Sequence, residues 1–432
     1  FAIHPSEVEF CGCETYRNIS ELPSLIDAAF VGVNRKATVD IILQLSKVNC
    51  GGAVCFASGY SEAVVELKDG YELQRALIDA AGRMPILGPN CYGIINYFDS
   101  FCLWPDQHGG QRVDSGVAII TQSSNIMINL TMQKRGLPIG YAVTAGNQAQ
   151  LGLAELATNI VKDTRVTALG LYVEGLGSIR NFEKLVSLCD ELGKAIVVIK
   201  IGKSEHAQLS AVSHTASLAG NDKGASALMK RLGVARVNSL SEFIETLKVF
   251  HCHGRLSGSS VASVSCSGGE ASLIADICNG SQLLFPKLTK EQTNGLNSAL
   301  GAKVALANPL DYHTYIWGDA SKMAQTFISI MQDKNIDIGI IIVDFPRSDF
   351  CDPDAWSCVV EAAVITKKAI KKPIALMSTL AENIEESVAK DLMTKNLIPL
   401  CGMDEGLAAI IAASTQKTDL DPVNYPVILP NN

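Results

Sequence analysis

The sequence predicts an α/β protein in which helices cover parallel β-sheets. The composition supports this fold class, since 47% hydrophobic and 19% charged residues with 35 glycines are typical of buried cores joined by tight turns. Segments with the helical spacing of apolar residues, such as 181–192 and 357–371, separate short apolar runs. These runs are rich in β-branched residues, as expected of strands buried on both faces: 117–120, 168–173, 195–199, 261–264, 338–343 and 373–377.

The length of 432 residues predicts two or three domains. Two polar, turn-rich stretches, 107–111 and 254–260, each precede a new strand, so we expect domain boundaries there. The second and third units are expected to share one plan, because the first strand of each ends in a hydroxyl-rich turn that leads into a helix. The expected units are residues 1–110, 111–256 and 257–417, followed by a proline-containing linker or tail at 418–432.

The overall charge and the cysteines exclude several classes of protein. With 36 basic and 44 acidic residues, the net charge of -8 offers no general attraction for nucleic acid or for anionic lipid. No apolar stretch reaches the roughly 18 to 20 residues of a membrane span. The 13 cysteines are an odd number and mostly lie in apolar runs, which predicts reduced thiols of a cytoplasmic protein.

Three predicted helix starts are candidate anion-binding sites. A strand that ends in small polar residues before a helix leaves backbone N–H groups unpaired at the positive end of the helix dipole, which favours phosphate or carboxylate. The segments are 121–125, 213–220 and 265–270. The alternative for each is ordinary capping of a helix by Ser or Thr.

The segment 213–220 differs from the other two because it contains a histidine. His214 lies among small residues, so its ring has the room to act as a nucleophile toward phosphorus. Such a histidine needs a carboxylate on its other ring nitrogen, and Glu174 at the end of the strand 169–173 is well placed to supply it. The alternative is a histidine in a surface loop.

Several motifs together resemble one known family. Residues 213–220, Ser-His-Thr-Ala-Ser-Leu-Ala-Gly, resemble the phosphohistidine loop of the NDP-forming acyl-CoA synthetases, the superfamily that includes succinyl-CoA synthetase. Residues 87–96 are similar to the closing motif of that family's CoA-binding domain, and residues 172–175 to the strand that carries the carboxylate partner of the histidine. Residues 308–311 resemble the family's Asn-Pro-x-Asp turn. Because these motifs occur in the family's order over essentially the whole chain, the resemblance is specific.

The resemblance implies an α/β architecture with a Rossmann-like CoA-binding domain followed by two flavodoxin-like parallel-sheet ligase domains. It also implies that a carboxylic acid, CoA and ATP give acyl-CoA, ADP and phosphate through an acyl phosphate, with His214 as the phosphoryl carrier and Glu174 as the group that fixes its tautomer. The implied phosphate-binding residues are Gln122, Ser123, Ser124, Asn125, Ser213, Thr215 and Ala216. The implied CoA-binding residues are His4, Pro5, Val33, Asn34, Ser58, Gly59, Gly88, Pro89, Asn90 and Cys91.

The chain also departs from the family pattern. Residues 1–5 look like the second strand of the CoA-binding domain, so we expect the first strand and its glycine-rich loop to precede Phe1. The turn at 121–125 lacks the glycine of the family's Ser-Gln-Ser-Gly, which changes how closely its backbone approaches phosphate. No part of the chain resembles an ATP-grasp domain. We therefore expect ATP and Mg²⁺ to be bound mainly by a separate subunit or a C-terminal part, no metal ligands here, and an oligomeric assembly.

The third unit is expected to hold the small carboxylic acid substrate, because residues 311–319 are unusually aromatic. These aromatic residues are interpreted as a pocket wall that offers a cation-π face for an onium acid such as a sulfoniopropionate or a betaine. The alternative is aromatic packing at a domain seam. Asp344 and the region 349–354 either line the same cleft or belong to a solvated loop. The candidate pocket residues are Asn308, Asp311, Tyr312, His313 and Trp317.

The favoured function is thus the CoA-binding and ligase portion of an acyl-CoA synthetase. Two alternatives stay open. One is a lyase that activates an onium acid with CoA and then eliminates a leaving group, and the other is a CoA-sensing regulatory module without catalysis. The presence of both His214 and Glu174 favours an enzyme over the regulatory module.

Overall fold

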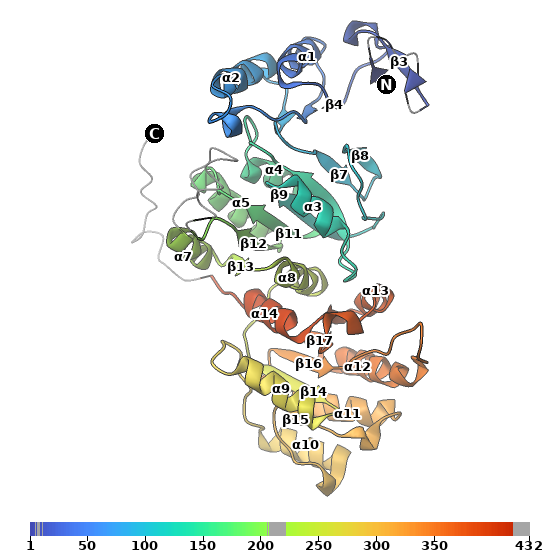
Figure 1. Cartoon of the computed structure of the whole chain (residues 1–432). Helices are drawn as coiled ribbons and strands as arrows, with labels where there is room; N and C mark the ends of the chain where they lie inside the picture. The colour runs from blue at the N-terminus through green and yellow to red at the C-terminus, as the bar shows by residue number, and fades with distance from the viewer. Residues whose placement is uncertain (5, 7–8, 11, 205, 207–221, 418–432) are drawn as a thin grey trace.

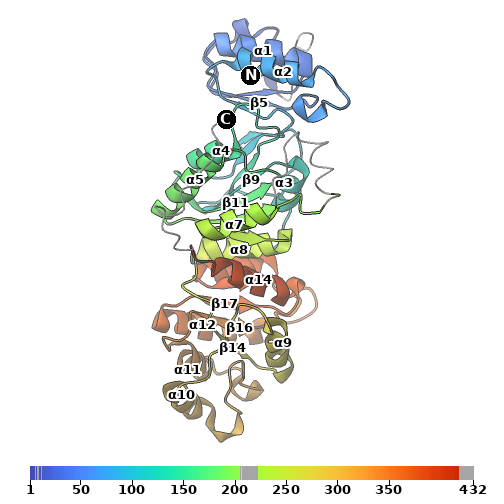
Figure 2. The ribbon, with the colours of Figure 1, turned by 90° about the vertical axis from the view of Figure 1, so that its left-hand side faces the viewer.

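The computed structural model describes the chain except for residues 5, 7–8, 11, 205, 207–221 and 418–432. Its elements form three α/β bodies stacked end to end, with the first body at one end, a central body, and the third body at the other end (Figures 1 and 2). The expected tail at 418–432 lies outside the described residues. All six strands and both helices predicted from the sequence pattern are present.

The first body contains two small sheets. One sheet has the order β1-β3-β2 and the other is a parallel sheet of order β4-β5-β6. Helix α1 buries Thr38, Ile42 and Leu45, whose spacing of four and three residues places them on one face of the helix. The elements are β1 (Ala2–Ile3), β2 (Glu9–Phe10), β3 (Cys13–Tyr16), β4 (Ala29–Val31), α1 (Arg35–Lys47), β5 (Ala53–Cys55), α2 (Gly70–Ala81) and β6 (Ile86–Leu87).

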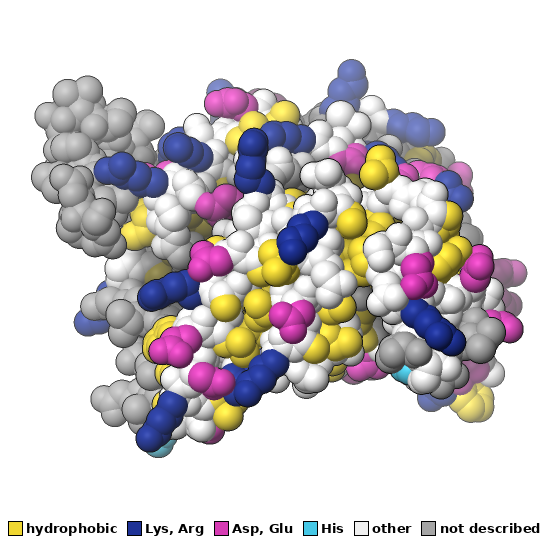
Figure 3. Space-filling view, turned by 90° about the horizontal axis from the view of Figure 1, so that it is seen from above, with side chains coloured by type: hydrophobic (Ala, Val, Ile, Leu, Met, Phe, Trp, Pro, Cys, Tyr) yellow, Lys and Arg dark blue, Asp and Glu magenta, His cyan; other side chains and the backbone are white. Residues whose placement is uncertain are grey.

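The surface at this end of the molecule has charges of both signs. Figure 3 views this end and shows basic and acidic side chains interspersed with exposed hydrophobic ones. This distribution agrees with the net charge of -8.

The central body is one seven-stranded sheet of order β13-β12-β11-β9-β10-β7-β8. Strands β9 to β13 are parallel and follow the 2-1-3-4-5 order of flavodoxin-like sheets. The antiparallel hairpin of β7 (Ile94–Asn96) and β8 (Phe101–Leu103) pairs with β10. The other elements are β9 (Gly116–Thr121), α3 (Ser124–Thr131), β10 (Ile139–Thr144), α4 (Leu153–Ile160), β11 (Val166–Val173), α5 (Ile179–Glu191), β12 (Ala195–Lys200), α7 (Asp222–Leu232), β13 (Ala235–Val237) and α8 (Leu240–Cys252).

The β7–β8 hairpin falls within the expected unit 1–110, but the structure adds it to the sheet of the next unit. Its physical role there is to cover the edge of β10, which would otherwise present unpaired backbone groups. The connection between the two bodies is apolar as well, since Val54 and Leu87 of the first body share a buried cluster with Ala118 and Ile120 of β9.

The third body repeats the plan of the central one. Its five parallel strands have the order β15-β14-β16-β17-β18, which is again 2-1-3-4-5. The elements are β14 (Val261–Ser265), α9 (Gly268–Cys278), α10 (Lys290–Leu300), β15 (Leu310–Asp311), α11 (Ala320–Met331), β16 (Ile338–Ile342), α12 (Ser357–Ile370), β17 (Ile374–Met377), α13 (Glu386–Thr394), β18 (Ile398–Leu400) and α14 (Met403–Ala413). The expectation that the second and third units share a plan is therefore confirmed.

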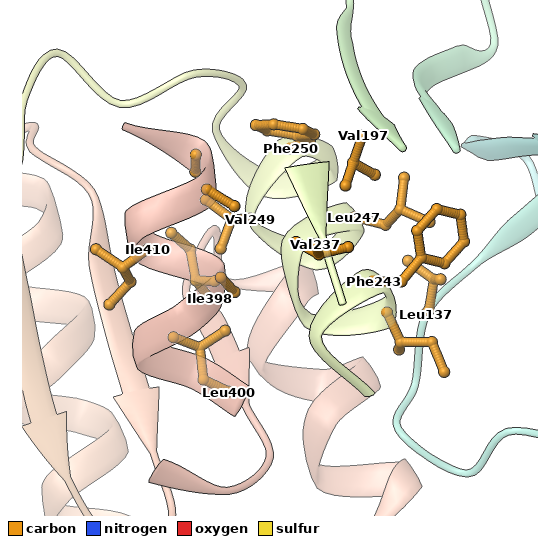
Figure 4. Packing of buried hydrophobic residues seen from close by; sticks show 14 of the residues in the cluster. Leu137, Val197, Val237, Phe243, Leu247, Val249, Phe250, Ile398, Leu400 and Ile410 are labelled. Carbon is orange, nitrogen blue, oxygen red and sulfur yellow. The ribbon is translucent and has the colours of Figure 1, made fainter. Parts of the chain in front are cut away.

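A continuous hydrophobic core joins the central and third bodies. Helix α8 of the central body packs against α14 of the third, and Phe243 and Leu247 of α8 lie in the same buried cluster as Leu400 and Ile410 (Figure 4). Helices at this seam are apolar on more than one side because each covers its own sheet and also the neighbouring helix.

The same seam contains buried charges. Glu245 and Lys248 of α8 are both 0% exposed, and their charged atoms lie 2.8 Å apart. Arg135, in the loop before β10, pairs with Glu245 at 3.0 Å and donates a hydrogen bond to the Cys401 carbonyl. Burial lowers the pKa of Lys248, but Glu245 and Cys401 outweigh burial and the net shift is upward. The seam is thus fixed by directed polar contacts as well as by apolar packing.

Candidate functional site

The carboxyl edge of the central sheet brings two of the predicted residues together. Gln122 follows β9 and Glu174 follows the neighbouring strand β11. Gln122 is 8% exposed, and its Oε1 accepts hydrogen bonds from the backbone N–H groups of Glu174 and Gly175. The side chain of Gln122 therefore fixes the turn from which Glu174 extends.

The hydroxyl groups of the turn after β9 are used within the protein. Ser123 caps α3, since its Oγ accepts from the Ile126 N–H at 3.5 Å. The Oγ of Ser124 accepts from the Tyr92 N–H at 3.2 Å and so ties the first body's loop to this turn. Asn125 is exposed. The alternative of helix capping thus describes Ser123, and a phosphate contact in this turn stays a prediction.

The end of β12 adds a cation that the sequence analysis did not single out. Lys200 is the register partner of Val173 and is 2% exposed. Burial lowers the pKa of Lys200, whereas Asp222 and Glu174 act in the opposite direction. The signal available in the sequence was a lysine that closes the apolar run 195–199.

After residues 207–221, which the structure does not describe, the chain resumes at Asp222, the first residue of α7, which pairs with Arg236 of β13. The predicted residues Ser213, His214, Thr215 and Ala216 lie between β12 and α7, outside the described residues. The connection that carries them therefore starts from the strand next to β11, at the edge where Glu174 is located.

The predicted CoA-binding residues follow the three strands of the first parallel sheet. Val33 and Asn34 come after β4, Ser58 and Gly59 after β5, and residues 88–91 after β6, so all three turns lie at one edge. Asn34 caps α1 by accepting from the N–H groups of Lys36 and Ala37 at 3.2 and 3.0 Å. Pro5 lies outside the described residues. His4 and Val33 line one cavity of about 700 Å³ between the small sheet and β4.

The loop at 88–91 is held tightly between the first and central bodies. Gly88 has a φ of +97°, and a Cβ there would come within 2.7 Å of the Cys91 Sγ, so glycine is required. The Pro89 carbonyl accepts from the Asn147 N–H at 2.9 Å, and the Asn90 N–H donates to the Ala57 carbonyl at 3.0 Å. Burial raises the pKa of the Cys91 thiol, which is therefore neutral.

A second cavity, of about 530 Å³, lies at the carboxyl edge of the third sheet. The indoles of Trp317 and Trp356 meet there edge to face, with ring centroids 5.8 Å apart. Asp344, which follows β16, also lines this cavity, in agreement with one of the two interpretations of that residue. The lining residues are Cys266, Glu270, Thr314, Trp317, Ile342, Val343, Asp344 and Trp356.

Two of the residues predicted to form the pocket wall have a different role in the structure. The Asn308 amide donates to the Val261 carbonyl at 2.8 Å and its Oδ1 accepts from the Ser263 N–H at 3.1 Å. Tyr312 is 1% exposed and its ring packs against Phe327. Asn308 hydrogen-bonds to the backbone of β14 and Tyr312 fills the core. The expectation that these two residues form the pocket wall is therefore wrong.

The other two predicted residues lie beside the cavity as a pair. The Asp311 Oδ1 accepts from the His313 N–H at 2.8 Å, and its Oδ2 lies 3.5 Å from the His313 Nδ1. Neither Asp311 nor His313 lines the cavity. Glu270 does line it, and the negative charge of Asp311 helps to raise the pKa of Glu270. Of the five predicted pocket residues, the structure therefore places only Trp317 on the wall of this cavity.

Glu270, on the wall of this cavity, has a strongly shifted pKa. Burial, together with the charges of Asp344 and Asp311, raises its pKa to about 7. The helix start at 265–270 was predicted from the sequence, but the role of this side chain was not. The signal was a glutamate at the third position of a helix that opens with two glycines.

Three further observations concern the described residues alone. Their cysteines are all free of disulfide bonds. No group of three or more His, Cys, Asp and Glu side chains among them is arranged to hold a metal ion. None of the helices that the structure describes has the length and apolar character needed to span a bilayer.

Comparison with known families agrees with this architecture. Residues 1–97 match the CoA binding domain family, and residues 114–250 match the family described as succinyl-CoA ligase like flavodoxin domain. The two matches cover the two turns that meet at Tyr92 and Ser124 and the edge that carries Gln122 and Glu174.

Two curated relatives extend the similarity into the third body. The alpha subunit of acetate-CoA ligase [ADP-forming] II from Pyrococcus furiosus is 28% identical over 424 residues, which are 96% of this chain and 89% of that subunit. Trans-feruloyl-CoA synthase FCS1, from an unknown prokaryotic organism, is 28% identical over 355 residues, 81% of this chain. The matched region is 50% of that synthase, so the chain spans about half the length of this relative.

A solved structure supports the fold over nearly the whole chain. The dinucleotide forming acetyl-coenzyme A synthetase 1 of Ca. Korarchaeum cryptofilum, in complex with phosphate and ADP, superposes with a TM-score of 0.78 at 21% identity. The superposition covers 96% of this chain and 87% of the other. The chain therefore contains a CoA binding domain and a succinyl-CoA ligase like flavodoxin domain, and over nearly its whole length it is similar to NDP-forming acyl-CoA synthetases.

Proposed function

We propose that this chain is the CoA-binding and ligase portion of an enzyme that converts a small carboxylic acid, CoA and ATP into acyl-CoA, ADP and phosphate. The observation that carries the proposal is the Gln122 side chain, whose Oε1 binds the backbone of the turn that bears Glu174. This contact presets a carboxylate at the edge from which the connection containing His214 departs. A preset carboxylate is what a phosphoryl-carrying histidine requires.

His214 is the phosphoryl carrier in this proposal. When the phosphohistidine reacts with the acid, the P–N bond breaks and a P–O bond to the substrate carboxylate forms, which gives the acyl phosphate. Glu174 accepts the N–H of the other ring nitrogen, so the imidazole keeps one tautomer throughout. The CoA thiol then loses its proton and attacks the acyl carbon, the C–O bond to phosphate breaks, and phosphate leaves. Both steps depend on positioning and charge compensation.

The first body is proposed to hold CoA at the edge formed by the turns after β4, β5 and β6. The hydrogen bond from the Tyr92 N–H to the Ser124 Oγ supports this proposal, because it joins that edge to the turn after β9. A thioester formed at this junction lies between the CoA-binding turns and the edge that carries Glu174. Gln122, Ser123, Ser124 and Asn125 are proposed to surround the phosphate on the central side.

Nucleotide binding is assigned to a further part of the enzyme. The chain spans about half of the feruloyl-CoA synthase but most of the alpha subunit named above. We therefore propose that an ATP-grasp part, either a separate subunit or a C-terminal domain, binds ATP with Mg²⁺, and that the enzyme is an oligomer. CoA and ATP chemistry with reduced cysteines fits a cytoplasmic enzyme.

The proposal is tested by running the reaction backwards, because that direction needs no nucleotide. The purified chain is incubated with radioactive phosphate and a panel of acyl-CoA thioesters, and acid-labile label on the protein is counted. We expect labelling with at least one thioester and none in His214→Ala. The matched control is His206→Ala, an exposed histidine near the same connection, which should label like the parent.

Glu174→Gln provides the second measurement. It keeps the size of the side chain and removes the charge, so labelling should slow by about 10²-fold or more if the carboxylate orients the imidazole. Unchanged labelling in His214→Ala contradicts the proposed carrier. A parent chain that binds CoA but is labelled by no thioester favours a regulatory module instead.

A further inference from the structure

The cavity of the third body has an aromatic wall assembled from two separate loops. Trp317 directly follows the short 3-10 helix Thr314–Ile316, and Trp356 ends the 3-10 helix Asp354–Trp356. The two residues are far apart in the sequence, but both of their indoles line the same cavity of about 530 Å³. This volume lies in the range of small-molecule sites, and indole faces attract cations.

Glu270 lines this cavity and takes no part in capping the helix on which it lies. It is the third residue of α9, where a glutamate often binds back to the N-cap. The next helix, α10, does use this device, since Thr289 and Gln292 form a complete capping box. In α9, Ser267 forms no side-chain cap bond, and the Glu270 Oε2 is inaccessible and has no hydrogen-bond partner among the described residues.

The electrostatic field of the cavity is negative. The Asp344 carboxylate accepts hydrogen bonds from the Thr379 N–H and Oγ1 and from the Asn383 amide, which hold it in place beside the cavity. Asp311 adds a second carboxylate next to Glu270. No Lys or Arg occurs among the described residues that line the cavity. A bare carboxylate or phosphate is repelled by this arrangement, whereas a cation relieves the repulsion between the acids.

We propose that this cavity binds the cationic group of the substrate, so that the acid activated by the enzyme carries an ammonium or onium group besides its carboxylate. Glu270 supplies the charge, and the Trp317 and Trp356 indoles supply the aromatic faces. That the bound acid is a substrate rests on the proposed synthetase function. The binding of a cation in this cavity does not depend on that function.

The test compares acids that differ in charge and not in shape. Glycine betaine and 3,3-dimethylbutanoate are isosteric, with a quaternary nitrogen in one and a carbon in the other. 4-Aminobutanoate and pentanoate form the corresponding pair for a primary ammonium group. Binding of each to the full chain is measured by calorimetry, and we expect at least one cationic member to bind 10-fold or more tightly than its neutral match.

Variants locate the binding site. Glu270→Gln keeps the volume of the side chain and should reduce the preference for the cationic acid by at least fivefold. Trp317→Ala should weaken cation binding about 10-fold, and Trp317→Phe should restore part of the loss. The matched controls are Glu291→Gln, an exposed acid on α10, and Tyr315→Ala, whose ring is 69% exposed and does not line the cavity.

Equal binding within both pairs, or a preference that survives in Glu270→Gln and in Trp317→Ala alike, overturns the proposal. These outcomes are separate from the phosphohistidine assay, which reports on His214 and not on the third body. A chain that is labelled at His214 but shows no cation preference keeps the synthetase function and loses the cation site.

Discussion

The central and third bodies have the same topology but different charges at their carboxyl edges. In both, the residue that ends the first strand bonds to the turn that follows it. The Thr121 Oγ1 donates to the Ser123 carbonyl at 2.7 Å, and the Ser265 Oγ donates to the Ser267 carbonyl at 2.9 Å. The 2-1-3-4-5 strand order then places the following side chains at equivalent points.

The charges at those points differ. The central edge combines the neutral amide of Gln122 and the carboxylate of Glu174 with the buried Lys200. The third edge combines Glu270 with two other carboxylates and two indoles. Topology therefore sets where a ligand binds in this fold, whereas the residues after each strand set the charge of the ligand.

The largest expected effect concerns the seam that holds the two bodies together. Lys248→Met removes one partner of a fully buried ion pair and leaves the Glu245 carboxylate with Arg135 and the Cys401 N–H, so we expect a loss of about 3 to 5 kcal/mol in the free energy of unfolding. Urea denaturation measures it. Lys395→Met removes an exposed i,i+4 pair with Asp391 and should change stability by about 0.5 kcal/mol or less. Similar losses in both variants would show that the seam is not rigidly held.

The next effect compares the residues that follow the first strand of each body. Gln122→Ala leaves the Glu174 and Gly175 N–H groups without their acceptor and should cost about 1 to 3 kcal/mol. Cys266→Ala should cost less, because Cys266 is only partly buried on the wall of a cavity, so its truncation removes little packing. Hydrogen exchange should show faster exchange of the Glu174 and Gly175 amides in the first variant alone. Unchanged exchange there would contradict the assigned role of Gln122.

A smaller effect depends on pH. The pKa of Glu270 is raised to about 7, so the folded protein holds a proton that the unfolded chain releases near 4.5. This contribution to stability is present below about pH 4.5 and is lost as the pH rises through about 7. Glu270→Gln should remove the dependence and be relatively more stable above pH 7, by about 1 kcal/mol because the side chain is only half buried. A parallel pH profile for parent and variant would contradict the negative field at this edge.

The smallest effect separates the two helix starts. Ser123→Ala removes a long cap bond of 3.5 Å and should destabilise the protein by about 0.5 kcal/mol. Ser267→Ala removes no cap bond, so its stability should equal that of the parent. Thermal unfolding of the two variants side by side tests the difference, and equal losses would show that both serines act in the same way.

Much of the fold follows from local pattern. The buried strands such as β12 and β16 are continuous apolar runs, and such runs between helical segments leave few alternatives to parallel sheets. The β7–β8 hairpin is different, because the local sequence of residues 94–103 does not indicate whether the hairpin pairs with β10 or with the first sheet. Pairing partners far apart in the sequence are selected by the edges that remain open.

The site shows the same division. The proximity of Gln122 and Glu174 could be anticipated, since both follow strands of one parallel sheet. Asn308, from the turn 308–311, and Tyr312, from the aromatic stretch 311–319, were expected at the pocket. Instead, Asn308 hydrogen-bonds to the backbone of β14, and Tyr312 packs in the core against Phe327. Side-chain direction depends on what surrounds a residue in space, which its neighbours in the sequence do not specify.

The sequence by itself determined the class of fold, the repeated strand-turn-helix plan and the family motifs around His214, because these depend on period, turn chemistry and short-range order. Only the tertiary structure decided that Trp317, Trp356 and Glu270 share a cavity, and that Lys248 and Glu245 lie buried against Cys401. Such contacts join residues that are distant along the chain, and their charges interact strongly only because the fold removes water from between them.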